Sequence, residues 1–251
     1  MADSPSHKHE NQRVDGTSLS STHSSAQAME TGLTFDLPTE YQGEDPKHVA
    51  EVFAAAKRFC LSDTTPEQMV RYAHSTMSES IVRSIIEAAT RSRPAGRTPS
   101  EVIARLDREK KRAAAAHRAE RDFIKCLQEA GLRFITENQQ QKDAVARGQT
   151  LQATPDVLFS VPTLIAGHQC LWVEYKGYFG FPKNPFVATK ERRQVRKYAT
   201  HLGPGLVVFA VGFQKGHLRI DGVKTARQED IVRELRSRGE LSHDETKHDG
   251  E

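Results

Sequence analysis

Residues 154–176 read TPDVLFSVPTLIAGHQCLWVEYK, and this stretch decides the fold. Its runs 157–161 and 169–176 are short and rich in β-branched and aromatic residues, which predicts two strands. The connection 162–168 contains Gly167 and is short enough to close a hairpin. Because side chains alternate along a strand, Glu174 and Lys176 share one face. The hairpin is therefore expected to bring Asp156, at the start of the first strand, beside Glu174.

Helix-like and strand-like patterns continue on both sides of this hairpin. A helix opens at Thr98, resumes its period through 113–130 and ends at Gly131, and residues 132–136 predict a short strand. Further predicted elements are a helix over 187–201, a central strand over 206–213 (LVVFAVGF) and a last helix around Ile231, Val232 and Leu235. The order α-β-β-β-α-β predicts an α/β domain with a mixed sheet over residues 99–238.

Residues 34–98 predict a small helical region. Asp45 and Pro46 are a typical N-cap and first helical residue, and further helices are expected from Thr65 and from Ser78. The short break at 75–77 is consistent with a helix-turn-helix. Two interpretations stay open, a DNA-docking module or a bundle that only packs against its neighbour.

Composition narrows the class of protein. Of 251 residues, 37% are hydrophobic, and the net charge is +3, which excludes a histone-like binder and a highly acidic disordered chain. The polar stretches 1–33 and 239–251 are predicted to be disordered tails. A polar N-terminus, the absence of an apolar run of about 20 residues, and three cysteines without a CxxC pair favour the nucleus or cytoplasm over secretion or a membrane.

The residues at the strand ends have a recognisable chemistry. Two carboxylates on adjacent strands, Asp156 and Glu174, form an oxygen site suited to Mg²⁺ or Mn²⁺. A lysine beside them, Lys176, can orient water and stabilise charge on a phosphoryl group, which together suit metal-assisted phosphodiester hydrolysis. The alternative is an exposed strand face on which Glu174 and Lys176 form an ordinary ion pair.

Residues 115–213 resemble the nuclease domain of the PD-(D/E)xK superfamily. Within it they are most similar to the TPD-motif family, which is related to archaeal Holliday-junction resolvases. The matching stretches are AERD at 119–122, ATPDVL at 153–158, WVEYK at 172–176 and LGPGLV at 202–207. With a looser similarity over residues 77–88, the resemblance covers more than half of the chain and implies a PD-(D/E)xK nuclease-like core.

The resemblance also implies roles for individual residues. Asp156 and Glu174 would be metal ligands, joined by the backbone carbonyl of Tyr175, and Lys176 would position the attacking water. Glu120 would be an additional acidic residue that reaches the metal through water, or else an ordinary solvated helix residue.

The helix over 187–201 matches polar positions of the family at Gln194 and Tyr198. Their spacing places them on one helical face, where they line the site or only edge the packing against the sheet. Outward-facing basic residues of this helix are expected to contact nucleic-acid phosphates, namely Lys190, Arg193, Arg196 and Lys197. A basic surface helix without nucleic acid is the alternative.

These observations predict a metal-dependent nuclease that hydrolyses DNA phosphodiester bonds. The resemblance implies that the DNA is branched or structured. The rival hypothesis is a catalytically silent adaptor that keeps the nuclease fold and acts through a codanin-like protein partner, which the resemblance implies. A homodimer is expected by analogy with resolvases. A helix-turn-helix transcription factor is the third hypothesis.

Overall fold

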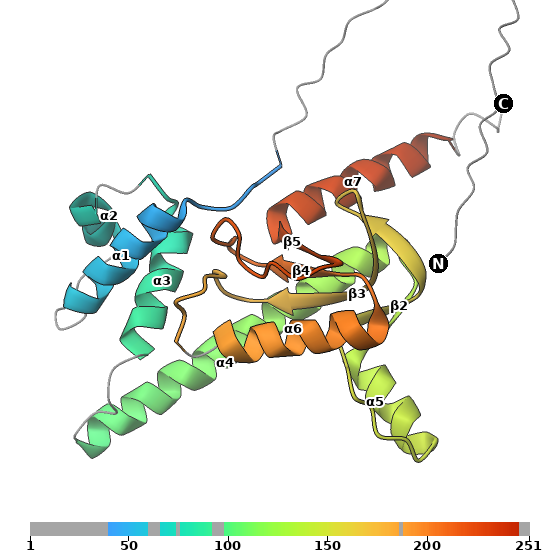
Figure 1. Ribbon diagram of the computed structural model, residues 1–251, viewed down its shortest axis with the longest axis horizontal. Coiled ribbons are helices and arrows are strands. Elements are labelled where there is room, and N and C mark those ends of the chain that lie inside the picture. Colours follow the sequence, from blue (N-terminus) through green and yellow to red (C-terminus); the bar gives the residue numbers. More distant parts are fainter. Residues whose placement is uncertain (1–39, 60–65, 74–75, 92–97, 186–187, 246–251) are drawn as a thin grey trace, which may run out of the picture. The chain divides into compact units, whose positions relative to one another are not determined.

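The computed structural model describes residues 40–59, 66–73, 76–91, 98–185 and 188–245 (Figure 1). The predicted tail 1–33 lies outside these ranges. Within them the chain forms seven helices and five strands, which confirms the expected mixed α/β class. No helix in the described ranges is long and apolar enough to cross a membrane.

The five strands form one sheet in the order β1-β2-β3-β4-β5. Antiparallel pairs join β1 to β2 and β2 to β3, whereas β3, β4 and β5 are parallel, so the sheet is mixed as predicted. The strands are β1 (Phe134–Thr136), β2 (Val157–Ile165), β3 (His168–Lys176), β4 (Gly205–Phe209) and β5 (Val223–Arg227). The central position of β3 places its carboxyl end, with Glu174 and Lys176, in the middle of the sheet.

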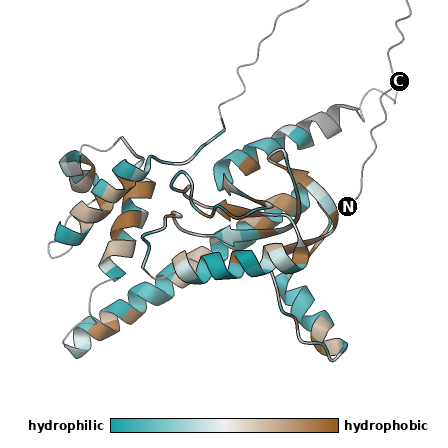
Figure 2. Ribbon diagram, viewed as in Figure 1, coloured by the Kyte–Doolittle hydropathy of each residue, from teal (hydrophilic) through white to brown (hydrophobic). Residues whose placement is uncertain are grey.

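Helices cover both faces of the sheet (Figures 1 and 2). On one face, α6 (Ala188–Leu202) packs Val195 and Tyr198 against Trp172 and Val207. On the other face lie α4 (Pro99–Glu129) and α7 (Gln228–Glu245). Their contribution to that core is Phe123, Leu127, Ile231 and Leu235, which pack with Val173, Tyr175, Leu206 and Val208. The apolar side of α6 thus faces the sheet, opposite its exposed basic residues.

Trp172 lies in the interior of the sheet and not at its edge. It is fully buried on β3, its Nε1 donates to the Gly203 carbonyl at 2.9 Å, and its ring meets Tyr198 edge to face. A Cβ at Gly205 would lie 2.0 Å from the indole, so only glycine lets β4 approach this ring.

The hairpin between β2 and β3 is tighter than the sequence predicts. β2 continues through Pro162 to Ile165, with a register shift between Leu158 and Thr163, and the turn is only Ala166 and Gly167. Both turn residues have positive φ, 52° and 65°. These values are typical of the two-residue turns that match the twist of paired strands.

Two short elements are absent from the predicted order. α5 (Glu137–Ala146) follows β1, and β5 adds a parallel strand at the edge of the sheet. Both are polar and bury few side chains, so they lack an apolar period. Two predicted boundaries also move: β4 ends at Phe209, before Gly212 turns the chain with a φ of 123°, and α7 continues past Gly239 to Glu245.

Three helices precede α4, as predicted: α1 (Pro46–Phe59), α2 (Pro66–Ala73) and α3 (Glu79–Arg91). Asp45 caps α1, since its Oδ1 accepts from the backbone N–H of Lys47 at 2.7 Å. The break between α2 and α3, on which a helix-turn-helix depends, includes residues 74–75, outside the described residues.

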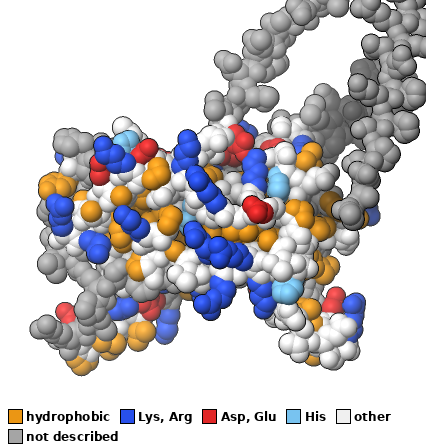
Figure 3. All heavy atoms as spheres, in the orientation of Figure 1, with side chains coloured by type: hydrophobic (Ala, Val, Ile, Leu, Met, Phe, Trp, Pro, Cys, Tyr) orange, Lys and Arg blue, Asp and Glu red, His pale blue; other side chains and the backbone are white. Residues whose placement is uncertain are grey.

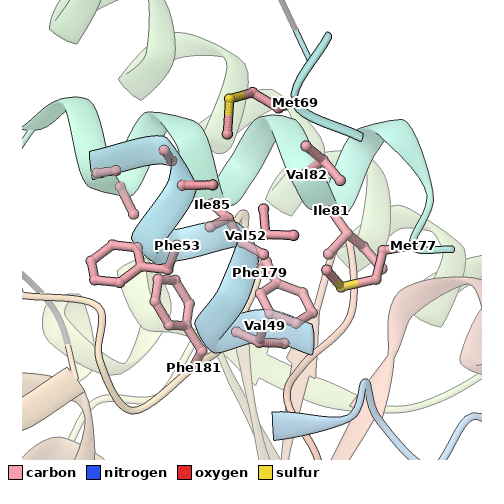
Figure 4. Close-up of a cluster of buried hydrophobic side chains, with 14 residues drawn as sticks. Val49, Val52, Phe53, Met69, Met77, Ile81, Val82, Ile85, Phe179 and Phe181 are labelled. Carbon is pink, nitrogen blue, oxygen red and sulfur yellow. The ribbon is translucent and has the colours of Figure 1, made fainter. Parts of the chain in front are cut away.

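These helices share their core with the loop that follows β3. Phe179 and Phe181 lie among Val52, Phe53 and Ile85 (Figure 4). The backbone N–H of Phe179 also donates to the Ser84 hydroxyl on α3 at 2.9 Å. The helices are therefore packed onto a segment that begins three residues after Lys176.

Candidate active site

Asp156 and Glu174 meet where β2 begins and β3 ends, as the hairpin predicts. The backbone N–H of Asp156 points to Glu174 Oε2 at 3.4 Å. The backbone N–H of Tyr175 donates to Asp156 Oδ2 at 2.6 Å. The two carboxylates are thus fixed by main-chain groups of the opposite strand, which limits their movement relative to each other.

Lys176 is bonded to Glu174 on the same face of β3. Its Nζ donates to Glu174 Oε1 at 2.7 Å and to Gln194 Oε1 at 3.2 Å. The Lys176 and Glu174 side chains are only 14% and 4% exposed. The alternative of an exposed strand face with a solvated ion pair is therefore wrong.

α6 supplies the remaining polar contacts of the site. Gln194 Nε2 donates to the Tyr198 hydroxyl at 2.8 Å, and that hydroxyl donates to the Thr154 carbonyl at 3.0 Å. A continuous set of hydrogen bonds thus runs from Glu174 through Lys176 to α6 and back to the TPD stretch. Gln194 and Tyr198 face the site, as one of the two open interpretations expected.

Burial and mutual repulsion change how the site titrates. Loss of solvent and then the neighbouring Glu174 raise the pKa of Asp156 to about 8. Burial also raises the pKa of Glu174, although the Lys176 ammonium partly offsets this. Burial alone would lower the pKa of Lys176, but Glu174 and Asp156 hold it above its ordinary value. The site therefore favours an additional positive charge.

Glu120 lies at the margin of this network. It is on α4, its side chain is 30% exposed, and Oε2 is 3.8 Å from Nδ1 of His117. Burial raises the pKa of Glu120, and its charge adds to the rise at Asp156. Hydrogen bonds thus connect five predicted site residues: Asp156, Glu174, Lys176, Gln194 and Tyr198. Glu120 is connected to Asp156 only by electrostatic repulsion.

A further carboxylate, that of Glu137, lies beside the site and was not among the predicted site residues. It is the first residue of α5, its backbone N–H donates to the Asp156 carbonyl at 3.2 Å, and its Oε1 accepts from the Thr154 hydroxyl at 3.4 Å. Its charge contributes to the raised pKa of Glu174. A Thr136 to Gln139 capping box is the sequence signal that predicts a helix here.

Glu191 is the acidic residue of the otherwise basic α6, but it is buried and does not lie on the surface of the helix. Its side chain is 2% exposed and its Oε2 lies 3.5 Å from Nε2 of His217. The carboxylate adds to the raised pKa of Lys176 and of Tyr178. No local sequence signal predicts this, because the residue that covers it comes from a loop beyond β4.

The donor set fits a hard divalent cation. Two buried carboxylates that repel each other offer oxygen ligands, and a cation would relieve the repulsion that raises the pKa of Asp156. Within the described ranges, no group of three or more His, Cys, Asp or Glu side chains is placed to hold a metal ion. A metal held here would therefore need a backbone carbonyl and water to complete its ligands.

The outer face of α6 is basic. Lysine and arginine side chains gather over this helix in Figure 3. The four predicted phosphate contacts are all exposed: Lys190, Arg193, Arg196 and Lys197. Positive charge is thus available on the solvent side of the helix whose inner face carries Gln194 and Tyr198.

Comparison with known proteins places the chain among relatives named as nucleases. It is similar to CDAN1-interacting nuclease 1 of Danio rerio, with 33% identity over 107 residues, or 39% of this chain and 33% of that protein. The Homo sapiens protein of the same name is 32% identical over 87 residues, or 35% of this chain and 28% of that protein. The chain thus spans about a third of the length of these relatives. No solved structure matches it.

A family match covers the sheet and the site together. The family described as "protein of unknown function TPD sequence-motif" matches residues 97–232. That range begins just before α4, includes Thr154, Pro155 and Asp156, and ends within α7. Because the match covers more than half of the chain, the protein belongs to the TPD sequence-motif family.

Proposed function

We propose that this protein is a metal-dependent nuclease with a PD-(D/E)xK-like core that hydrolyses DNA phosphodiester bonds. The observation that carries this proposal is the set of buried Glu174 with half-buried Asp156 and Lys176, joined by hydrogen bonds where β3 ends and β2 begins. Relatives named as nucleases support the same class of reaction.

Asp156 and Glu174 would hold Mg²⁺ or Mn²⁺, with the Tyr175 carbonyl as a third ligand and Glu120 acting through water. The ion, when bound, supplies Lewis-acid activation of a phosphate oxygen and of water. Burial excludes bulk water from these carboxylates and fixes their direction. Glu137 adds negative field from α5 and thereby favours a cation at the pair.

In this proposal Lys176 stabilises negative charge and positions the attacking water. Its ammonium stays charged at neutral pH, since Glu174 and Asp156 raise its pKa. Gln194 holds Nζ from the side of α6, and Tyr198 holds the Gln194 amide in turn. A donor fixed in this way can orient a water molecule and stabilise the negative charge that develops on the phosphoryl oxygens.

DNA is the proposed substrate because positive charge lies on the helix that borders the site. Residues 183–197 contain six basic residues and one acidic residue, and that acidic residue is buried against His217. Contacts of Lys190, Arg193, Arg196 and Lys197 with backbone phosphates would position the duplex without reading its sequence. Branched or flapped DNA is the expected preferred form.

The proposal is tested by incubating the purified chain with branched, flapped and single-stranded oligonucleotides in Mg²⁺, Mn²⁺ or EDTA. We expect metal-dependent cleavage that Asp156→Asn and Lys176→Gln each reduce by at least about a hundredfold. Asp107→Asn, an exposed carboxylate on the same chain, is the matched control and should cleave normally. Cleavage that survives both site variants would contradict the assignment.

The second candidate function is a catalytically silent adaptor that binds a codanin-like protein. The name of the relatives, CDAN1-interacting nuclease 1, favours such a partner. The buried charged set favours the enzyme, because buried ionic groups contribute little to stability and a pure adaptor does not need them. An adaptor predicts that the intact chain binds the partner equally well with and without Asp156→Asn, and cleaves no DNA.

A further inference from the structure

A hollow with a mostly polar lining lies on the outer side of α6. Its volume is about 490 Å³, and its polar lining comes from Thr189, Arg192, Arg193, Arg196 and His217. The first four residues lie on α6, and His217 comes from the loop after β4. Its lining thus differs from the residues that hold the acidic pair.

The arginines of this hollow are free to bind an external anion. Among the residues that the structure describes, no carboxylate forms an ion pair with Arg192, Arg193 or Arg196. Other arginines of the chain do have such partners, as in the pairs Arg112 with Glu87 and Arg238 with Glu234. Three unneutralised guanidinium groups in one concave site attract a ligand of more than one negative charge.

The buried imidazole of His217 adds a polar group to the wall of the hollow. Its side chain is 2% exposed, and neither ring nitrogen has a hydrogen-bond partner in the described part of the chain. Phe209 packs edge-on against the ring at 5.4 Å, and Glu191 Oε2 lies 3.5 Å from Nε2. Nε2 therefore faces the Glu191 carboxylate, and Nδ1 is the ring nitrogen that has no polar neighbour among the described residues. A buried polar atom without a partner beside a basic hollow supports a ligand site there.

We propose that this hollow binds a terminal phosphate monoester of a DNA strand. The inference deepens the proposed function and rests on it for the identity of the strand. A bridging phosphodiester carries one negative charge, whereas a terminal phosphate carries close to two and has three strong acceptor oxygens. Three guanidinium groups with the Thr189 hydroxyl match the terminal group better in both charge and number of donors.

The position of the hollow gives the bound end a use. Arg193 lines the hollow, and the next residue, Gln194, holds Lys176 on the inner side of the same helix. A strand end held by α6 is therefore kept at a fixed separation from the acidic pair. The end phosphate selects where along the strand the proposed nuclease acts.

The test measures binding of one oligonucleotide in three forms, with a 5′-phosphate, with a 3′-phosphate, or with hydroxyls at both ends. Fluorescence anisotropy of the full chain in EDTA separates binding from cleavage. We expect a phosphate at one of the two ends to tighten binding about tenfold, and inorganic phosphate to compete for that gain. Arg192 is the one arginine of the hollow outside the four proposed backbone contacts, so Arg192→Gln should bring the ratio toward one, whereas the matched control Arg236→Gln on α7 should keep it.

Equal affinity for all three forms in the wild-type chain would overturn the inference. So would an Arg192→Gln variant that weakens the phosphorylated and hydroxyl forms by the same factor, because that result assigns Arg192 to internal phosphodiesters. Binding in EDTA is independent of catalysis. A chain that selects phosphorylated ends but never cleaves contradicts only the nuclease, and one that cleaves without end selection contradicts only the hollow.

Discussion

Asp156 lies in the candidate site, where its negative charge is energetically unfavourable. Its carboxyl is buried beside Glu174, and the resulting loss of solvent and repulsion raise its pKa to about 8. A side chain chosen for stability alone would be neutral here. The raised pKa therefore supports the proposed role of Asp156 in binding a cation.

The metal-free protein should lose stability as the pH rises. The native pKa of Asp156 is about 8 against an ordinary 3.8, so between these values the folded chain binds more protons than the unfolded chain. The free energy of unfolding therefore falls from about pH 4 to about pH 8. Thermal unfolding in EDTA should give a lower Tm at pH 8 than at pH 5.

Asp156→Asn removes this titration and should reduce the difference in Tm, because the amide stays neutral at both pH values. Asp107→Asn should keep the wild-type difference, since that exposed residue lies outside the site. The same pH dependence in wild type and Asp156→Asn would show that another group is responsible.

The positions of individual site residues could be predicted from the sequence where local spacing and strand alternation decide them. Asp156, Glu174 and Lys176 could be paired because strand alternation and one hairpin decide their positions. Glu191 could not be placed, since its burial depends on His217, which is distant in sequence. Glu137 was missed together with the helix that it begins.

At the scale of single elements, the β2–β3 hairpin sets the register that brings the carboxylates together. Ala166 has a φ of 52°, which costs a residue with a side chain about 1 kcal/mol or more relative to glycine. Its backbone N–H donates to Glu234 and its carbonyl accepts from Lys224, so the turn is also bound to α7 and β5. The hairpin is thus held in a strained conformation by its neighbours.

Two single substitutions in this turn should have opposite effects. Ala166→Gly is expected to stabilise the chain by about 0.5–1 kcal/mol, because it removes the strain at positive φ. Gly167→Ala should destabilise it by about 1 kcal/mol, although no atom lies within 4 Å of the added Cβ. Urea unfolding measures both, and a stabilised Gly167→Ala would contradict the assigned turn.

Elements with a strong apolar pattern were predictable, and those without one were not. α1, α3 and α6 each have a buried stripe, β4 is buried along its whole length, and β3 is buried at five of its nine residues. In contrast, α5 buries only Gln140 and Ala144, and β5 buries only Ala226. Their existence depends on capping and on pairing with β4, which periodicity does not detect.

At the scale of the whole described unit, the first three helices and the site are physically connected. Phe179 and Phe181 follow Lys176 closely and complete the core of α1 and α3 (Figure 4). The sequence predicted these helices correctly but gave no sign of this shared core, because Phe179–Pro185 resembles an ordinary Gly- and Pro-rich loop. The helices therefore stabilise the segment that follows Lys176 of the candidate site.

Phe181→Ala should destabilise the protein by about 3–5 kcal/mol, since it leaves a cavity among Phe53, Phe179 and Val49. Tyr72→Ala on α2 is the matched aromatic control and should cost much less, because Tyr72 is 56% exposed. Chemical unfolding of both variants measures the difference. Equal losses would mean that Phe181 is not part of a packed core.

Asp156 and Glu174 are proposed to hold one divalent ion together. Calorimetric titration of the full chain with Mn²⁺ at pH 7.5, in two buffers of different ionisation enthalpy, tests it most directly. One bound ion is predicted, with release of a proton from the acidic pair and loss of binding in Asp156→Asn and in Glu174→Gln. Absence of binding in the wild-type chain, or binding that both variants retain, would contradict the account.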